Sequence, residues 1–222
     1  MKIGINLVGV SYNDGYGRYR NYEDAIDGFM QNVITPLKKE GHDTGFYIYT
    51  YDNQKRNSIL ESYTPTKKYH FTNPTLNKLG GGDKLPSGYK TISSTYISSL
   101  EQLKNEDLDL VISTRFDINF FKNPFKEYQF DFTKFNFLWR EPEYTHLPIV
   151  NDTFIVFPYY MLDNVIDSIN EMETNPPHNV NVAMHNWYLP MVNQVGKDKV
   201  QWVCDEFVNA ISNDLYKLMR HG

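Results

Sequence analysis

The sequence contains almost no cysteine and no long apolar run. Cys204 is the one cysteine in 222 residues, which excludes an internal disulfide and a cysteine-rich zinc site and fits a reducing compartment. No stretch approaches the roughly 18 apolar residues of a membrane span. The N-terminal segment MKIGINLVGVSYNDG is apolar but short and has no small-residue cleavage site. We therefore expect a cytoplasmic protein that begins with a strand and has no membrane span.

A basic block is missing as well. The chain has 22 Lys and Arg against 27 Asp and Glu, a formal net charge of -5 at pH 7. Proteins that hold nucleic acid need clustered positive charge to neutralise phosphates, so nucleic acid is not the expected partner. If the ligand is a phosphate ester, the acidic balance suggests a divalent cation that offsets its charge.

Several nucleotide-binding and catalytic motifs are absent. After the first predicted strand, the segment DGYGRYR gives G-x-G-x-x-R and not the dinucleotide fingerprint. The segment GYKT at 88–91 lacks the glycine spacing of a P-loop. CxxC, HExxH and G-x-S-x-G do not occur. These absences exclude the standard forms of several hydrolase, redox and nucleotide sites.

What the sequence does contain is an alternation of apolar strands and amphipathic helices, with 41% hydrophobic residues. The pattern predicts strands at 2–10, 44–51, 67–72, 109–113, 135–141, 153–158 and 200–204. It predicts helices at 21–40, 58–64, 90–103, 160–172 and 181–192, and a short helix in the C-terminal tail. Pro36 should kink or end the first helix. No repeat or linker interrupts the chain, so we expect a single domain over 1–222, an α/β fold with a mostly parallel sheet.

The segment DLVISTRFDINF combines a buried strand with charge. The strand over 109–113 is followed by Arg115 and Asp117, with Phe116 between them. Ligands of parallel sheets bind outside the carboxyl ends of the strands, where these residues fall. Mg²⁺ and Mn²⁺ take oxygen ligands, so Asp117 is the first candidate metal ligand. Arg115 would contact a donor or pair with an acid. An ordinary solvated strand end is the alternative.

Several segments together resemble the GT-A glycosyltransferase fold, a Rossmann-like three-layer sandwich, over almost the whole chain. These are GVSYNDGYGRYR, YTYDN, SGYKTISSTY, LDLVISTRFDI and NDTFIVFP. The R-x-D at 115–117 resembles a variant of the D-x-D metal motif that has lost its first acid. The size and the start KIGINLVGVSY are similar to glycosyltransferase domains encoded by chlorella viruses, which would place the protein in a host cytoplasm.

The resemblance implies a set of contacts to a nucleotide sugar, made by Val10, Ser11, Tyr12, Asp52, Lys90, Arg115, Phe116 and Asp117. The loop at 10–12 would meet the base, Asp52 the base or ribose, and Lys90 the diphosphate. Asp117 would bind Mn²⁺ or Mg²⁺, with His185 as the second metal ligand. Arg115 stands where the family more often has Asp, which leaves the usual contacts of that position open. His185 is otherwise a helix histidine with a satisfied hydrogen bond.

An inverting transfer also needs a base close to the acceptor hydroxyl. Asp152, in VNDTF, is the candidate, and Glu141 and Glu143 are alternatives. A loop aspartate that caps the backbone is the other interpretation of Asp152. Without a carboxylate there, a retaining mechanism is favoured. The aromatic residues near these positions could form a platform that stacks on a sugar ring, namely Trp139, Tyr144 and Trp187.

The predicted function is therefore a metal-dependent glycosyltransferase that moves a sugar from a UDP-type donor to a glycan hydroxyl. Two other classes stay open. One is a nucleotidyltransferase that makes a nucleotide sugar, although the loop GVSYNDGYGRYR matches its glycine-rich loop poorly. The other is a non-catalytic sugar-binding module on a degenerate transferase fold, for which the missing first acid is the best support.

Overall fold

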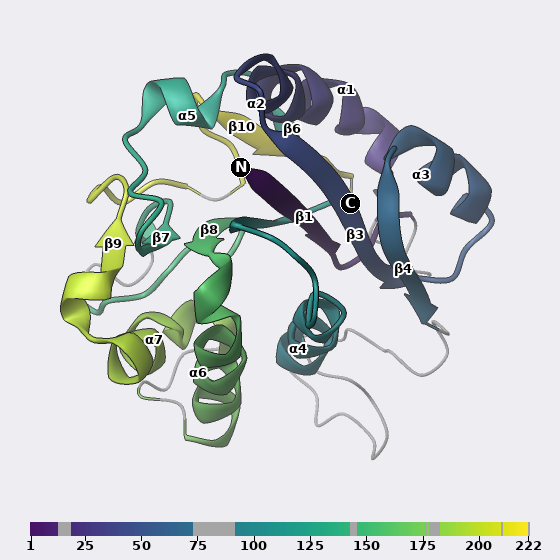
Figure 1. Cartoon of the computed structure of the whole chain (residues 1–222). Coiled ribbons are helices and arrows are strands. Elements are labelled where there is room, and N and C mark those ends of the chain that lie inside the picture. Colours follow the sequence, from purple (N-terminus) through teal and green to yellow (C-terminus); the bar gives the residue numbers. More distant parts are fainter. Residues whose placement is uncertain are drawn as a thin grey trace.

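The computed structural model describes residues 1–12, 19–72, 92–142, 146–175, 177, 183–209 and 211–221. Its centre is a seven-stranded sheet (Figure 1). In spatial order the strands are β4 (Thr66–Thr72), β3 (Asp43–Tyr51), β1 (Lys2–Val8), β5 (Leu110–Arg115), β8 (Phe154–Pro158), β7 (Phe135–Phe137) and β9 (Val200–Trp202). Every predicted strand segment thus contributes a strand to this sheet.

The sheet is parallel except at β8. Strands β4, β3, β1 and β5 pair in parallel, and β7 pairs in parallel with β9. Strand β8 is antiparallel to both of its neighbours, β5 and β7. The carboxyl ends of β3, β1 and β5 therefore lie on one edge of the sheet, and the prediction of a mostly parallel sheet is confirmed.

Helices cover both faces of the sheet (Figure 1). On one face lie α1 (Ile26–Phe29), the π-helical turn η2 (Met30–Ile34), α2 (Thr35–Lys39) and α3 (Arg56–Ser62). On the other lie α4 (Ile92–Glu101), α6 (Leu162–Thr174) and α7 (Tyr188–Val195). Each layer buries its own apolar cluster against the sheet. The predicted three-layer α/β arrangement is confirmed.

Shorter helices connect these elements. They are η1 (Tyr22–Asp24), α5 (Pro124–Glu127), η5 (Tyr159–Met161), η6 (Ala183–Asn186) and η7 (Lys197–Lys199). The predicted helix over 181–192 is therefore split into η6 and α7. The apolar side of α6 is buried, as an amphipathic helix over 160–172 requires, and consists of Leu162, Val165, Ile166, Ile169 and Met172.

The first helical segment shows the irregularity that Pro36 predicts. Asn21 begins it by accepting a hydrogen bond from the Glu23 backbone N–H. The segment then widens into the π turn η2 just before Pro36, which lies in the first turn of α2 and has no N–H to donate. Gly41 follows the helix at φ +81°, a conformation that favours glycine.

The C-terminal tail is a correction to the prediction, because it forms strands and not a helix. Strand β10 (Tyr216–Leu218) pairs antiparallel with β6 (Ile118–Phe120), and β11 (Arg220–His221) pairs with β2 (Tyr19–Arg20). Tyr216 and Leu218 are buried and Lys217 is exposed. This period of two favours a strand over a helix. The tail thereby reaches the segment that follows β5.

Close packing of α1 fixes the position of β6. Gly28 lies so near β6 that an added Cβ would stand 1.9 Å from the Asn119 side-chain oxygen and 2.6 Å from the Phe120 carbonyl. Asn32 donates from its side chain to that same Phe120 carbonyl at 2.8 Å. These contacts hold the chain just beyond Asp117 against the first helical layer.

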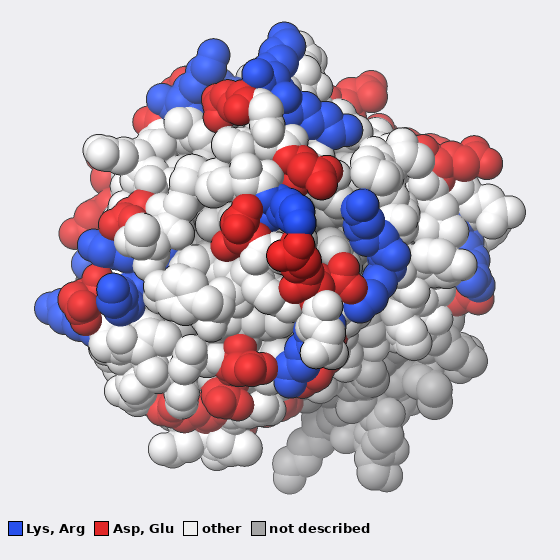
Figure 2. All heavy atoms as spheres, viewed as in Figure 1, with Lys and Arg blue, Asp and Glu red and all other residues white. Residues whose placement is uncertain are grey.

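The described helices include none that is both long and apolar enough to cross a membrane. On the face shown in Figure 2, Lys and Arg side chains alternate with Asp and Glu and do not form an extended surface of one sign.

A buried amide ties three elements together at the centre of the sheet. The Asn6 side chain on β1 donates to Ser99 on α4 at 3.0 Å and to Ser113 on β5 at 2.9 Å. All three residues are fully buried. Buried polar groups are costly when they lose their partners, so this network fixes α4 against the two central strands.

The substitution Asn6→Ala should therefore lower the free energy of unfolding by about 2 kcal/mol, because both serine hydroxyls lose a buried partner. Chemical denaturation measures this. Asn193→Ala is the control, since Asn193 bonds Glu171 on the exposed surface and its removal should cost far less. Equal midpoints for Asn6→Ala and the parent protein would show that the network contributes nothing.

Candidate functional site

The predicted site residues come from one edge of the sheet. Val8, the last residue of β1, is in register with Arg115 on β5 and with Tyr49 on β3. The loop at 10–12 follows β1, Asp52 follows β3, and Asp117 follows β5. Three of the segments singled out from the sequence therefore leave the sheet at its carboxyl edge, as the parallel arrangement requires.

Arg115 and Asp117 form a two-pronged ion pair. The Arg115 Nε donates to Asp117 Oδ1 and its Nη2 donates to Oδ2, both at 2.8 Å. A second guanidinium, that of Arg20 on β2, has its Nε 3.7 Å from the same Oδ2. The Asp117 side chain is only 2% exposed, against 22% for Arg115. The carboxylate is thus enclosed, and the Arg115 side chain is partly exposed to solvent.

The electrostatics around Arg115 keep it charged. Burial lowers the pKa of Arg115, but the Asp117 carboxylate, and Asp152 beyond it, raise that pKa above its usual value. The chain terminus adds rigidity here, because the Met219 N–H donates to the Asp117 carbonyl at 2.7 Å. The Arg115 guanidinium is therefore fixed, and the Asp117 carboxylate sets its orientation.

Asp152 and His185 lie next to each other, although the sequence separates them by 33 positions. Asp152 Oδ1 is 4.0 Å from His185 Nε2, with the two side chains 15% and 18% exposed. The Val150 N–H donates to the His185 carbonyl at 3.0 Å and so joins the two segments. Asp152, the predicted base, and His185, the predicted second metal ligand, are therefore neighbours at a partly exposed place on the molecule.

The residues on either side of Asp152 are anchored in the core. The Asn151 side-chain oxygen accepts from the Thr153 N–H at 3.1 Å and from its hydroxyl at 2.6 Å. The Thr153 hydroxyl also shares a hydrogen bond of 2.6 Å with the Tyr216 hydroxyl. With both neighbours held, the Asp152 carboxylate projects from a fixed backbone. Tyr216, on the C-terminal strand β10, thus positions Asp152.

Arg20 and Tyr216 were not predicted as site residues. Both reach the site through the small antiparallel pairs β2–β11 and β6–β10. The sequence did not indicate these pairs, because the C-terminal tail was expected to be a helix. The only sequence signal for β10 is the alternation of apolar and charged residues in Tyr-Lys-Leu at 216–218, and three residues make it weak.

The loop predicted to meet a base is well ordered by side-chain contacts. The Ser11 hydroxyl accepts from Thr50 at 2.8 Å and is buried, as is Val10. The Tyr12 hydroxyl accepts from Gln54 at 3.2 Å, and the Lys55 ammonium lies 5.7 Å from the Tyr12 ring centre. Tyr12 is thus the residue of this loop whose side chain is partly open to a ligand. Its role stays a prediction.

The other predicted contacts are dispersed. Asp52 is exposed and lies 3.9 Å from Arg56 Nη1 in the next helix. Phe116 is buried and packs edge-on against Tyr63, at 5.7 Å between ring centres. A Phe116 contact to a ligand would therefore have to use main-chain atoms. Lys90, Glu143 and Tyr144 lie outside the described residues.

The predicted aromatic platform is wrong for both tryptophans. Trp139 is fully buried and stacks on Tyr216 at 5.4 Å. Trp187 is fully buried and donates its ring N–H to Ser168 at 2.7 Å. Burying these large apolar rings is more favourable than exposing them to water, so neither tryptophan can stack on a sugar in this conformation.

A metal fits the described side chains poorly. Within the ranges that the structure describes, no three His, Cys, Asp or Glu side chains are grouped so that they could hold a metal ion. Both Asp117 oxygens already accept hydrogen bonds from Arg115. The metal roles of Asp117 and His185 stay predictions that this arrangement does not support.

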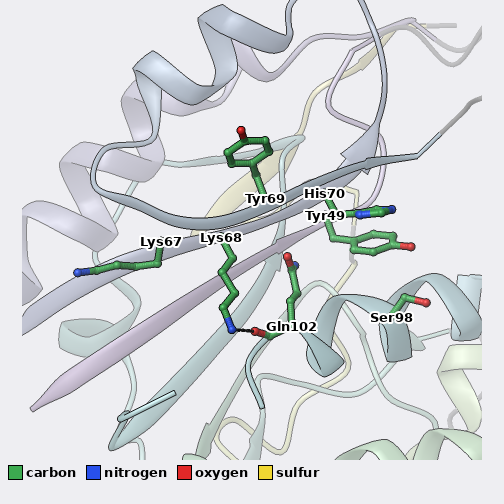
Figure 3. Close-up of a pocket in the computed structure, with 7 residues that line it drawn as sticks. All are labelled: Tyr49, Lys67, Lys68, Tyr69, His70, Ser98 and Gln102. Carbon is green, nitrogen blue, oxygen red and sulfur yellow. Dashed lines mark hydrogen bonds between the residues drawn. The ribbon is translucent and has the colours of Figure 1, made fainter. Parts of the chain in front are cut away.

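A separate hollow of about 410 Å³ lies beside the edge strand β4, between it and α4 (Figure 3). Its lining residues, none of them predicted, are Tyr49, Lys67, Lys68, Tyr69, His70, Ser98 and Gln102. Lys68 donates to the Gln102 carbonyl at 2.9 Å and pairs with Glu106 at 2.6 Å. His70 stacks on Tyr49 at 4.9 Å. The polar groups of this hollow thus serve chiefly to join β4 to the sheet and to α4.

Comparisons with known proteins give limited information. No protein-family model matches the sequence, and no curated protein does. Among solved structures, the chain is similar to an active-site mutant of LgtC and to the galactosyltransferase LgtC in complex with donor and acceptor sugar analogues. Both are 10% identical with a TM-score of 0.49, and the match covers 91% of this chain and 72% or 73% of theirs. At this identity and TM-score the likeness does not assign a chemistry to this chain.

The substitution Asp117→Ala should lower the free energy of unfolding by about 3 kcal/mol, because it leaves two guanidiniums without their enclosed anion. Thermal or denaturant unfolding measures this. The control is Asp205→Ala, which removes the 68% exposed partner of Arg140 and should cost at most about 1 kcal/mol. Similar losses for the two variants would mean that the Asp117 pair is no stronger than a surface pair.

Proposed function

We propose that the protein is a glycosyltransferase that uses a nucleotide-sugar donor. The observation that carries the proposal is the charged group at the carboxyl edge of the sheet. A fixed guanidinium at Arg115 lies there beside the Asp152 and His185 pair. Such an edge is where open α/β sheets bind ligands. The resemblance of the loop at 10–12 and of the R-x-D segment to GT-A enzymes supports the same class.

The chemistry of sugar transfer matches this set of charges. The bond between the anomeric carbon and the diphosphate breaks, so negative charge develops on the diphosphate and positive charge on the sugar. Guanidiniums fixed before the reaction stabilise the leaving group without reorganising. The acceptor oxygen forms the new bond to the anomeric carbon, and its proton goes to Asp152. His185, at 4.0 Å, would stabilise that carboxylate and restrict its orientation.

The donor in this proposal is a UDP-type sugar and the acceptor is a hydroxyl of a glycan. Two experiments separate the alternatives. Release of pyrophosphate from a nucleoside triphosphate and a sugar phosphate would indicate a nucleotidyltransferase. Binding of sugars or nucleotides without turnover of any donor would indicate a non-catalytic module.

The substitution Asp152→Asn should lower the rate of UDP release from a UDP-sugar by about 100-fold or more, because the acceptor loses its base. UDP affinity should be retained, since the amide keeps the size of the side chain. A coupled assay of UDP release, with a panel of UDP-sugars, measures the rate.

The matched control is Asp163→Asn, at an aspartate on α6 that is 81% exposed. It should turn over donor like the parent protein. A parental rate for Asp152→Asn would remove Asp152 from the mechanism. No UDP release by the parent protein with any donor, in the presence or absence of Mn²⁺, would contradict the proposed function itself.

A further inference from the structure

We propose that Arg115 binds the donor diphosphate directly and takes the place of a divalent cation, with Asp117 as the group that positions it and Arg20 as a second cation close to Asp117. The inference rests on the proposed function and specifies how its site recognises a nucleoside diphosphate. It departs from the metal dependence that the sequence suggested.

The first argument is that both Asp117 oxygens already accept hydrogen bonds. Each of its oxygens accepts a hydrogen bond of 2.8 Å from Arg115, and the Arg20 guanidinium stands 3.7 Å away. A cation that used Asp117 would have to reach a side chain that is 2% exposed and compete with a two-pronged, charge-assisted contact. Breaking such an enclosed pair is strongly unfavourable.

The second argument is the sign of the charge. The enclosed Asp117 carboxylate lies 2.8 Å from Arg115 Nη2 and 3.7 Å from Arg20 Nε. Guanidinium charge fixed at this position disfavours a divalent cation and favours an anion, and the effect is strong where water is partly excluded. In the part of the chain that the structure describes, no cluster of metal-ligating side chains compensates for it.

The third argument is the geometry of Arg115. A guanidinium has five N–H donors, and the Asp117 contacts use one at Nε and one at Nη2. The side chain is 22% exposed, so part of it faces outward from the edge of the sheet. A partly exposed arginine whose remaining N–H donors are not used by Asp117 suits a phosphate, which it can bind with two parallel hydrogen bonds.

The test is a calorimetric titration of UDP into the full chain, once in EDTA and once in Mn²⁺. We expect binding in EDTA, with a dissociation constant within about 3-fold of that in Mn²⁺, a difference of less than 1 kcal/mol. Binding in Mn²⁺ alone would overturn the inference and leave the proposed function intact. Absence of UDP binding in both conditions would overturn both.

Variants identify the group responsible. Arg115→Lys keeps the charge but loses the fork and should weaken UDP binding in EDTA about 10-fold, and Arg115→Gln should weaken it about 100-fold. Arg140→Gln, at a guanidinium paired with Asp205, is the matched control and should bind like the parent protein. Thermal melts confirm that each variant is folded.

If Arg115→Gln does not fold, Arg115→Lys and a competition experiment decide. Inorganic pyrophosphate should displace UDP in EDTA from the parent protein, because both carry the diphosphate that the Arg115 guanidinium binds. Parental affinity in Arg115→Lys, or failure of pyrophosphate to compete, would overturn the inference.

Discussion

The two-pronged contact between Arg115 and Asp117 is the interaction on which the site depends. Charged residues at the end of a buried strand are often solvated, but an enclosed charge without a partner is costly. Here the Asp117 carboxylate is enclosed and the Arg115 side chain is partly exposed. The pair therefore turns the end of β5 into a fixed positive group at the ligand-binding edge of the sheet.

Distant parts of the chain converge on that pair. Arg20 comes from β2 near the N-terminus, and Tyr216 and Met219 come from the C-terminal tail. The tail holds Asp117 through its backbone and holds Asp152 through Thr153 and Tyr216. The antiparallel pairs β6–β10 and β2–β11 thus link the cation that would meet a diphosphate with the carboxylate that would accept a proton.

The sequence predicts the sheet and the main helices because burial imposes regular periods, as in the buried stripe Val165, Ile169 and Met172 of α6. It also predicts that Asp52 and Asp117 follow strands that end at one edge. It does not predict that Asp117 is shielded by Arg115, since R-x-D is equally compatible with two side chains that point apart. The helix predicted for the C-terminal tail is wrong because three or four residues are too few to show whether the apolar period is that of a strand or a helix. The pairing of β10 with β6 is also a long-range contact, which a local pattern does not record. Trp139 and Trp187 show the same limit, because burial of a single ring depends on packing that no local pattern records.

The most direct test of the central claim is a crystal structure of the protein with UDP, grown in EDTA. The account predicts the diphosphate within hydrogen-bond distance of Arg115, with the contact between Arg115 and Asp117 intact and no metal present. A diphosphate bound elsewhere on the molecule would contradict it. So would a second crystal, grown in Mn²⁺, in which the ion is bound to Asp117 and Arg115 has turned away.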